Sequence, residues 1–88
     1  MQADKAGVSR LLKTARGQID GILKMIEEDR YCIDVSNQLL ATQSILRKAN
    51  QQIIRSHMEH CVADAFASGN HPQEKIEEIL NVMDKMSR

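Results

Sequence analysis

The feature that most constrains the fold is a long apolar stripe in the middle of the chain, within a helical stretch from about Tyr31 to Ala67. Its members follow a pattern close to a seven-residue repeat, with steps of three, four or seven residues, and they are Val35, Leu39, Leu46, Ala49 and Ile53. This spacing puts all of them on one face of a helix. A helix of this length cannot bury its stripe against one shorter helix, so the sequence predicts that a second copy of the chain covers it.

Two shorter amphipathic segments flank the long helix. In residues 8–26 the apolar positions follow a three–four rhythm, and a charged break at residues 27–30 comes next. Gly69 and Pro72 mark the end of the long helix, and a short third helix follows, with the apolar face Ile76, Ile79, Leu80 and Met83. No strand pattern is present, so we expect one all-α domain of three helices that spans residues 1–88.

Charge is balanced overall but uneven along the chain. Twelve Lys and Arg offset twelve Asp and Glu, which argues against an ordinary basic nucleic-acid-binding domain. Residues 1–16 nevertheless carry four cations and one carboxylate, so an assembly that gathers these ends would present a positive patch. No apolar run could span a membrane and no signal-peptide pattern opens the chain, which predicts a cytoplasmic protein with reduced thiols.

Cys32, His57 and Cys61 are the candidate metal ligands. At about 100° per residue, His57 falls about 20° to one side of Cys32 and Cys61 about 20° to the other, so all three share one helical face. Cys32 and His57 are roughly 37 Å apart along the axis, so only an antiparallel partner helix could bring them together. Two thiolates and an imidazole suit three-coordinate Cu(I), and they would accept Zn(II) with a fourth ligand. The alternative is that both cysteines are small buried hydrophobic residues.

No catalytic set of residues is discernible. The chain lacks a recognisable Ser/His/Asp or paired-carboxylate arrangement, and Cys–His catalysis needs an oxyanion pocket that a small helical bundle seldom offers. We therefore expect that the protein is not an enzyme.

Three motifs resemble the copper-sensitive operon repressor (CsoR/RcnR) family. They are Arg-Gly-Gln-Ile-Asp-Gly-Ile at 16–22, Glu-Asp-Arg-Tyr-Cys-Ile-Asp-Val at 28–35 and His-Met-Glu-His-Cys at 57–61. The ordered Tyr-Cys and His-x-x-x-Cys set is similar to that of the Cu(I)-sensing branch. The resemblance implies an antiparallel four-helix-bundle dimer core and a dimer of dimers. It also implies a repressor of copper-efflux genes whose metal-free form binds operator DNA and is released by Cu(I).

The resemblance assigns the metal site residue by residue. It implies that Cys32 of one protomer binds Cu(I) together with His57 and Cys61 of the other. Tyr31 and Glu78 match the residues that hydrogen-bond the metal-bound imidazole in the family. Such partners fix the tautomer of a ligand and could transmit metal occupancy to the third helix.

The resemblance also implies which residues bind DNA. Arg16 and Lys48 match basic positions of the family, and Lys13 lies close by in the sequence. The family pattern has an arginine where this chain has Leu11, and here Arg10 comes one residue earlier. This departure leaves open which side chains contact the phosphates.

Other branches of the family resemble the chain less closely. Nickel and cobalt sensors use an additional amino-terminal histidine, and no His precedes His57; formaldehyde sensors rely on Pro at position 2, which here is Gln2. Persulfide sensors keep two cysteines without the histidine ligand. The alternative function is therefore a thiol-based persulfide- or redox-sensing repressor that uses Cys32 and Cys61. A third hypothesis is a structural helical oligomer or a copper buffer, either of which would have no DNA target.

Overall fold

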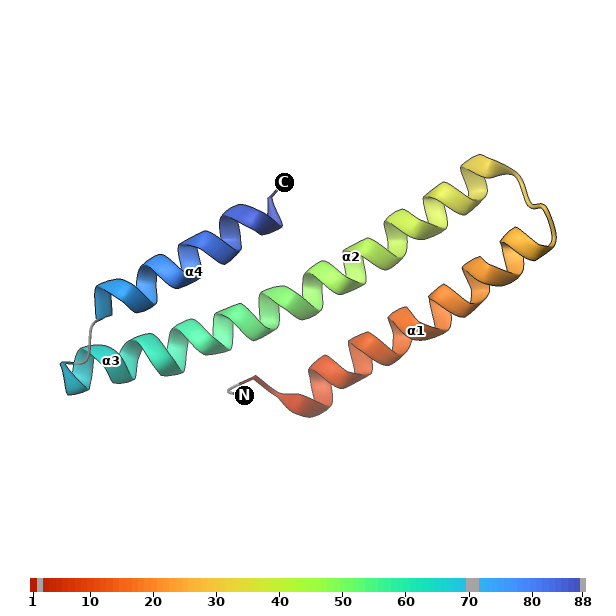
Figure 1. Cartoon of the computed structure of the whole chain (residues 1–88). Coiled ribbons are helices and arrows are strands. Elements are labelled where there is room, and N and C mark those ends of the chain that lie inside the picture. Colours follow the sequence, from red (N-terminus) through yellow and green to blue (C-terminus); the bar gives the residue numbers. More distant parts are fainter. Residues whose placement is uncertain (2, 70–71, 88) are drawn as a thin grey trace. The chain divides into compact units, whose positions relative to one another are not determined.

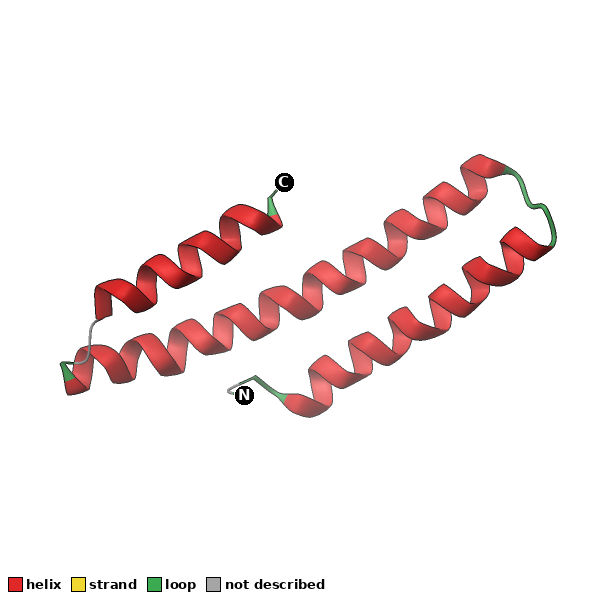
Figure 2. Ribbon diagram, viewed as in Figure 1, coloured by secondary structure: helices red, strands yellow, loops and turns green. Residues whose placement is uncertain are grey.

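The structure is a computed structural model that describes every residue except Gln2, Asn70, His71 and Arg88. The described part is helical and contains no strand (Figure 2), which confirms the predicted all-α class. Its elements are α1 (Lys5–Glu27), α2 (Cys32–His57), η1 (Met58–Val62), α3 (Ala63–Ser68) and α4 (Pro72–Met86). Because α2, η1 and α3 follow one another without a break (Figure 1), they correspond to the predicted long helix. No described helix is both long enough and apolar enough to cross a bilayer.

The chain divides into two compact units, and α2 contributes to both of them. One unit is Ala6–Asn50, which contains most of α1 and the first part of α2. The other joins Met1–Lys5 to Gln51–Arg88, and it contains the end of α2 together with η1, α3 and α4. The single domain predicted for residues 1–88 stays a prediction.

In the unit Ala6–Asn50, α1 and α2 form an antiparallel hairpin (Figure 1). Their buried residues recur every seven positions, and they are Val8, Ala15 and Ile22 on α1 with Thr42 and Ala49 on α2. This spacing gives each helix one straight buried line that faces the other helix. The small alanines allow the two backbones to approach closely. The hydroxyl of Thr42 donates a hydrogen bond of 2.8 Å to Oε1 of Gln18, which links the helices at a defined register.

The turn between the two helices is a Schellman motif built on an aspartate. Asp29 has a φ of 52°, in the left-handed region that glycine usually occupies. The backbone N–H of Arg30 donates to the carbonyl of Met25 over 3.0 Å, which closes the last turn of α1. The carbonyl of Tyr31 then accepts the N–H of Val35 at 3.2 Å and so starts α2. The charged break predicted at residues 27–30 thus contains the tight turn of the hairpin.

One side of the hairpin exposes large apolar side chains, and we call it the apolar side. Its residues are between 43% and 54% exposed, and they are Leu12, Ile19, Leu23, Leu39 and Leu46. At about 100° per residue, each of these residues is rotated about its helix axis by roughly 40–80° from the buried line of the same helix. The direction of this rotation, followed from the N-terminus to the C-terminus, is the same on α1 and α2. In an antiparallel pair, offsets of the same sense lie on the same side. Large apolar side chains gathered on one side in this way are typical of a protein contact. The second copy stays a prediction.

The unit that contains Gln51–Arg88 has a smaller apolar core than the hairpin. Ala65 of α3 and Ile79 of α4 are buried, and α4 contacts both η1 and α3. Gly69 has a φ of 74°, so it supplies the left-handed residue that was predicted to end the long helix. This arrangement brings α4 beside the segment that carries His57 and Cys61.

Candidate functional site

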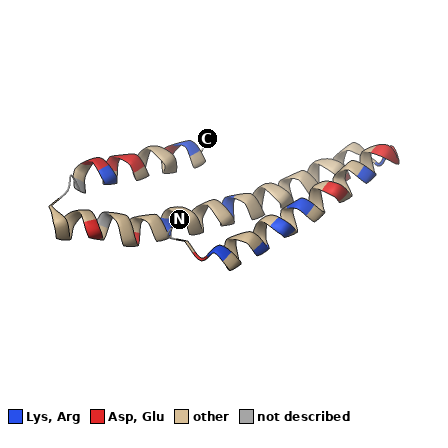
Figure 3. Cartoon of the chain, turned by 60° about the horizontal axis from the view of Figure 1, so that its bottom comes forward, with Lys and Arg blue, Asp and Glu red and all other residues tan. Residues whose placement is uncertain are grey.

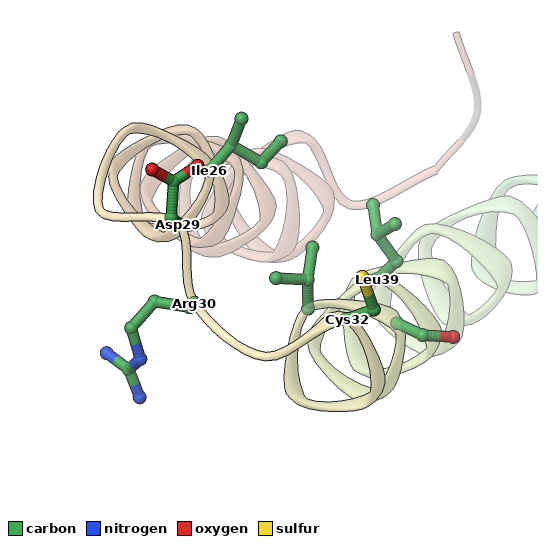
Figure 4. Close-up of a pocket in the computed structure, with 7 residues that line it drawn as sticks. Ile26, Asp29, Arg30, Cys32 and Leu39 are labelled. Atoms are coloured by element: carbon green, nitrogen blue, oxygen red, sulfur yellow. The ribbon is translucent and has the colours of Figure 1, made fainter.

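Cys32 lies at the start of α2, where its thiol is free and exposed. It borders a hollow of about 330 Å³ in the hairpin (Figure 4), which is lined by Ile26, Asp29, Arg30, Cys32, Val35, Ser36 and Leu39. The side chain of Arg30 points away from Cys32 in this view. The sulfur therefore lies among aliphatic side chains and stays accessible from solvent.

His57 ends α2, and its imidazole faces α4. Its Nε2 lies 4.0 Å from Oε2 of Glu78, with the two side chains 36% and 59% exposed. At this distance and exposure the pair contributes little to stability. Nε2 is the ring nitrogen that faces the carboxylate of Glu78. The structure thus brings together two of the residues expected at the site, and Glu78 belongs to the element expected to respond to the metal.

Cys61 lies in η1, which is a π-helix rather than a continuation of the α-helix. The long helix predicted from about Tyr31 to Ala67 is therefore present, but its α-helical winding is interrupted at Met58–Val62. Hydrogen bonds from residue i to i+5 give a wider turn, in which each residue rotates by less than in an α-helix. The angle calculated between Cys61 and Cys32 does not hold across this turn. Cys61 is half-buried and free, and Cys32 is exposed, so neither thiol is a buried core residue of the chain.

The expected ligands do not meet within one chain. Cys32 and His57 are the first and last residues of a 26-residue helix, whose rise separates them by roughly 37 Å. Tyr31 lies beside Cys32 at the start of α2, whereas Glu78 pairs with His57 at its end. Among the described residues, no three His, Cys, Asp or Glu side chains converge where they could hold a metal ion. The predicted site, with Cys32 from one chain and His57 and Cys61 from another, stays a prediction.

Most basic residues of α1 and α2 lie in long stretches without any carboxylate. Residues 5–19 and 35–58 contain no Asp or Glu, and their cations are Lys5, Arg10, Lys13, Arg16, Arg47, Lys48 and Arg55. Figure 3 shows Lys and Arg repeated along α1, whereas α4 carries several acidic residues. Lys13, Arg16 and Lys48, which are expected to bind DNA, are all exposed. The hairpin therefore has a positive field although the whole chain is neutral.

The structure does not gather these three cations on one surface of the hairpin. Arg16 is offset by about 100° from the buried line of α1 in the sense of the apolar side. Lys48 is offset by roughly 100° from the buried line of α2 in the opposite sense. Lys13 points almost directly away from α2. Arg16 and Lys48 of one chain thus lie on opposite sides of the hairpin, which sequence spacing along two separate helices could not reveal.

Comparison with known proteins identifies the family. A family model described as metal-sensitive transcriptional repressor matches residues 4–85. The chain belongs to this repressor family. The copper-sensing transcriptional repressor CsoR of Mycobacterium tuberculosis H37Rv is 41% identical over 83 residues, which cover 94% of this chain and 69% of the relative. The CsoR of Bacillus subtilis 168 is 38% identical over 85 residues, or 97% of this chain and 83% of the relative.

Two solved structures agree with the fold. The Cu(I)-bound copper-sensing repressor CsoR of Geobacillus thermodenitrificans NG80-2 has a TM-score of 0.86 and 32% identity, over 100% of this chain and 94% of that one. The nickel-responsive regulator InrS has a TM-score of 0.80 and 27% identity, over 98% and 96% of the two chains. These findings confirm the predicted CsoR/RcnR family and its copper-sensing branch. They also confirm that this metal-sensitive repressor is not an enzyme.

Proposed function

We propose that this repressor responds to Cu(I): its metal-free form binds operator DNA, and Cu(I) releases it so that copper-efflux genes are expressed. The observation that carries this proposal is the contact between His57 and Glu78. It links a candidate ligand on the long helix to α4, in a chain whose relatives are copper-sensing repressors. Because a repressor acts where its operator is, we place its action in the cytoplasm.

The donor set favours Cu(I) over the other metals that this fold serves. A nickel-responsive regulator shares the fold, so the fold alone does not select the metal. Cys32 of one protomer, with His57 and Cys61 of the partner subunit, would supply two thiolates and one imidazole, which suit Cu(I). Both thiols are free and at least partly accessible. When bound, Cu(I) would supply bonds that tie two subunits together at this point.

Glu78 would hold the imidazole in the form that binds metal. A carboxylate beside Nε2 favours a proton on that nitrogen, which leaves the lone pair of Nδ1 for the metal. Tyr31 of the partner subunit would add a second polar contact to the same ring. Metal occupancy would thereby restrain His57 and, through Glu78, the position of α4. A response of this kind requires contacts that differ between the metal-free and metal-bound states.

Assembly would follow from the apolar side of the hairpin. Two long helices packed antiparallel, with the two-fold axis beside Ile45 and Leu46, would bring Cys32 of each chain to His57 of the other. Leu46 is 43% exposed in the single chain, on the apolar side. The proposed unit is a four-helix-bundle dimer, and two dimers would form a tetramer.

DNA would be held mainly through its phosphates. Lys13, Arg16 and Lys48, repeated in each subunit, would supply the contacts, and sequence preference would depend substantially on DNA shape. Since Arg16 and Lys48 lie on opposite sides of one hairpin, an operator would meet them from different subunits. Lys48→Ala should weaken binding to matched and mutated operators by similar factors and flatten the salt dependence. An unchanged affinity with an unchanged salt slope would remove Lys48 from the DNA surface.

The deciding experiment is an operator titration with and without one Cu(I) per protomer, under anaerobic conditions. A parallel Cu(I) titration against a competing chelator reports metal affinity independently. Release of DNA at one equivalent supports the proposal. Tight Cu(I) binding without any operator binding would instead favour a copper buffer. Release by a polysulfide but not by Cu(I) would favour the persulfide-sensing alternative, in which Cys32 and Cys61 react.

A further inference from the structure

The register of the hairpin brings Arg10 level with Lys48. The hydrogen bond between Gln18 and Thr42 marks one level on both helices. Arg10 lies eight residues before Gln18 on α1, and Lys48 lies six residues after Thr42 on α2. Because the helices are antiparallel, both steps lead toward the same end of the hairpin. The two residues then differ in level by only about 3 Å.

Arg10 and Lys48 also share a side of the hairpin. Arg10 is offset by about 140° from the buried line of α1, and Lys48 by roughly 100° from that of α2, both away from the apolar side. We call this the polar side. It carries Arg10, Thr14, Gln18, Gln38 and Lys48, with Asp34 near the start of α2 and the half-buried Leu11, Met25 and Ile45 closer to the buried line. Both cations are exposed, whereas Leu11 is half-buried. The guanidinium of Arg10 is therefore open to a ligand on this side of the hairpin.

The polar side suits an anionic partner rather than a second protein chain. None of the exposed large apolar residues of Ala6–Asn50 lies on it; those of α1 and α2 fall on the apolar side or point away from the hairpin. The stretches 5–19 and 35–58, in which both cations lie, contain no carboxylate. Among the described residues neither cation has an ion-pair partner. Arginine and lysine at one level match the spaced phosphates of a nucleic-acid backbone.

We propose that Arg10 is a further DNA-contacting residue of this repressor, which with Lys48 binds the phosphate backbone on the polar side of the hairpin. The proposal rests on the operator-binding function proposed above. It adds Arg10 to the expected DNA-binding residues Lys13, Arg16 and Lys48. It also explains how the chain dispenses with an arginine at position 11.

The test is the operator affinity of Arg10→Gln at several salt concentrations. Lys24→Gln is the matched control, since Lys24 is an exposed cation of the same helix that points away from α2. Both variants lose one positive charge, so they change the long-range field alike. Arg10→Gln should lower the salt slope by roughly one unit for each Arg10 that touches a phosphate. Lys24→Gln should leave the slope unchanged.

A position swap separates contact from charge. In the double variant Ser9→Arg/Arg10→Ser the composition and net charge are unchanged, but the cation turns by about 100° to the opposite side of the hairpin. Ser9 is exposed, so the swap leaves the buried line intact. The swap should lose as much operator affinity as Arg10→Gln, with Cu(I) affinity retained. Helical circular dichroism would confirm that each variant is folded.

The outcomes distinguish this inference from the proposed function. If the unmodified protein bound no operator, the proposed function would fail and the inference with it. If Lys48→Ala weakened binding but Arg10→Gln matched Lys24→Gln, only the inference would fail. Wild-type binding by the position swap would also overturn it, because only net charge would then matter.

Discussion

Replacing Thr42 by valine tests whether one buried hydrogen bond holds the hairpin in register. Thr42 is 4% exposed, and its hydroxyl lies 2.8 Å from Oε1 of Gln18 and 3.2 Å from the carbonyl of Gln38. Valine has nearly the same shape, so the substitution removes the hydroxyl without opening a cavity. Both bonds of the hydroxyl are lost. The carbonyl of Gln38 keeps its helical backbone partner, so the bond that is lost without replacement is the one between the helices, to Gln18.

The expected cost follows from the surroundings of each group. A hydrogen bond of this kind contributes about 0.5–1.5 kcal/mol net. Gln18 is half-buried, so its amide can turn to water and avoids the full penalty of an unpaired buried group. The added methyl of valine returns up to about 0.8 kcal/mol of apolar burial. The single substitution should therefore lower the free energy of unfolding by about 0.5 kcal/mol, and the coupling between Thr42 and Gln18 should be about 1 kcal/mol.

A double-mutant cycle of Thr42→Val with Gln18→Met measures this coupling. Guanidinium unfolding of the metal-free protein, followed by circular dichroism, should be run at one protein concentration because association shifts apparent stability. Ser44→Ala is the control, since this exposed hydroxyl donates to the carbonyl of Leu40 in its own helix. A coupling below about 0.3 kcal/mol would lie within ordinary additivity and would refute the register role.

The remaining predictions concern assembly and the metal site. Leu46→Glu should dissociate the dimer, because it would bury an uncompensated charge at the two-fold axis; a folded, metal-binding dimer in sedimentation would contradict the proposed axis. Cys32→Ala should lower Cu(I) affinity by more than about 100-fold, because loss of a residue that only hydrogen-bonds a ligand already costs up to about 100-fold. Operator binding by the metal-free protein should stay intact. Glu78→Gln should cost about 10–100-fold in metal affinity or response, and wild-type behaviour in both assays would exclude a role for the carboxylate. His57→Ala should still bind Cu(I) through two sulfurs but release DNA poorly; full release at saturating copper would show that the imidazole has no regulatory role.

The helices could be predicted because their boundaries depend on local sequence. Seven-residue spacing and the Gly69 stop predicted a long helix from about Tyr31 to Ala67, and the helical stretch runs from Cys32 to Ser68. The π-helix could not be predicted in this way. Its residues contact α3 and α4, so its winding depends on packing between segments rather than on periodicity. The left-handed Asp29 was also missed, because aspartate is an uncommon residue at a position that favours glycine.

For the candidate site, the sequence could predict which residues share a face of one helix, but not how different helices or chains are placed against each other. Helical angles placed Cys32 and His57 on one face, and the resemblance to the family named Glu78, which the structure brings to 4.0 Å from His57. The ligand set itself stays a prediction, because it requires a second chain. The opposite placement of Arg16 and Lys48 depends on the register between α1 and α2. Thr42, a polar residue in line with the buried Ala49, was the available signal for that register.

The wider turn of η1 also bears on how the length of this region can vary during evolution. A π turn behaves as an α-helix that has absorbed one inserted residue, and the helices on either side keep their orientation. Deleting one residue within Met58–Val62 should therefore let α2 continue into α3 without rotating the buried Ala65 away from its partners. The same deletion before Cys61 would shorten the spacing from His57 to the cysteine from four residues to three. A change of one codon could thus alter the donor geometry while leaving the fold intact.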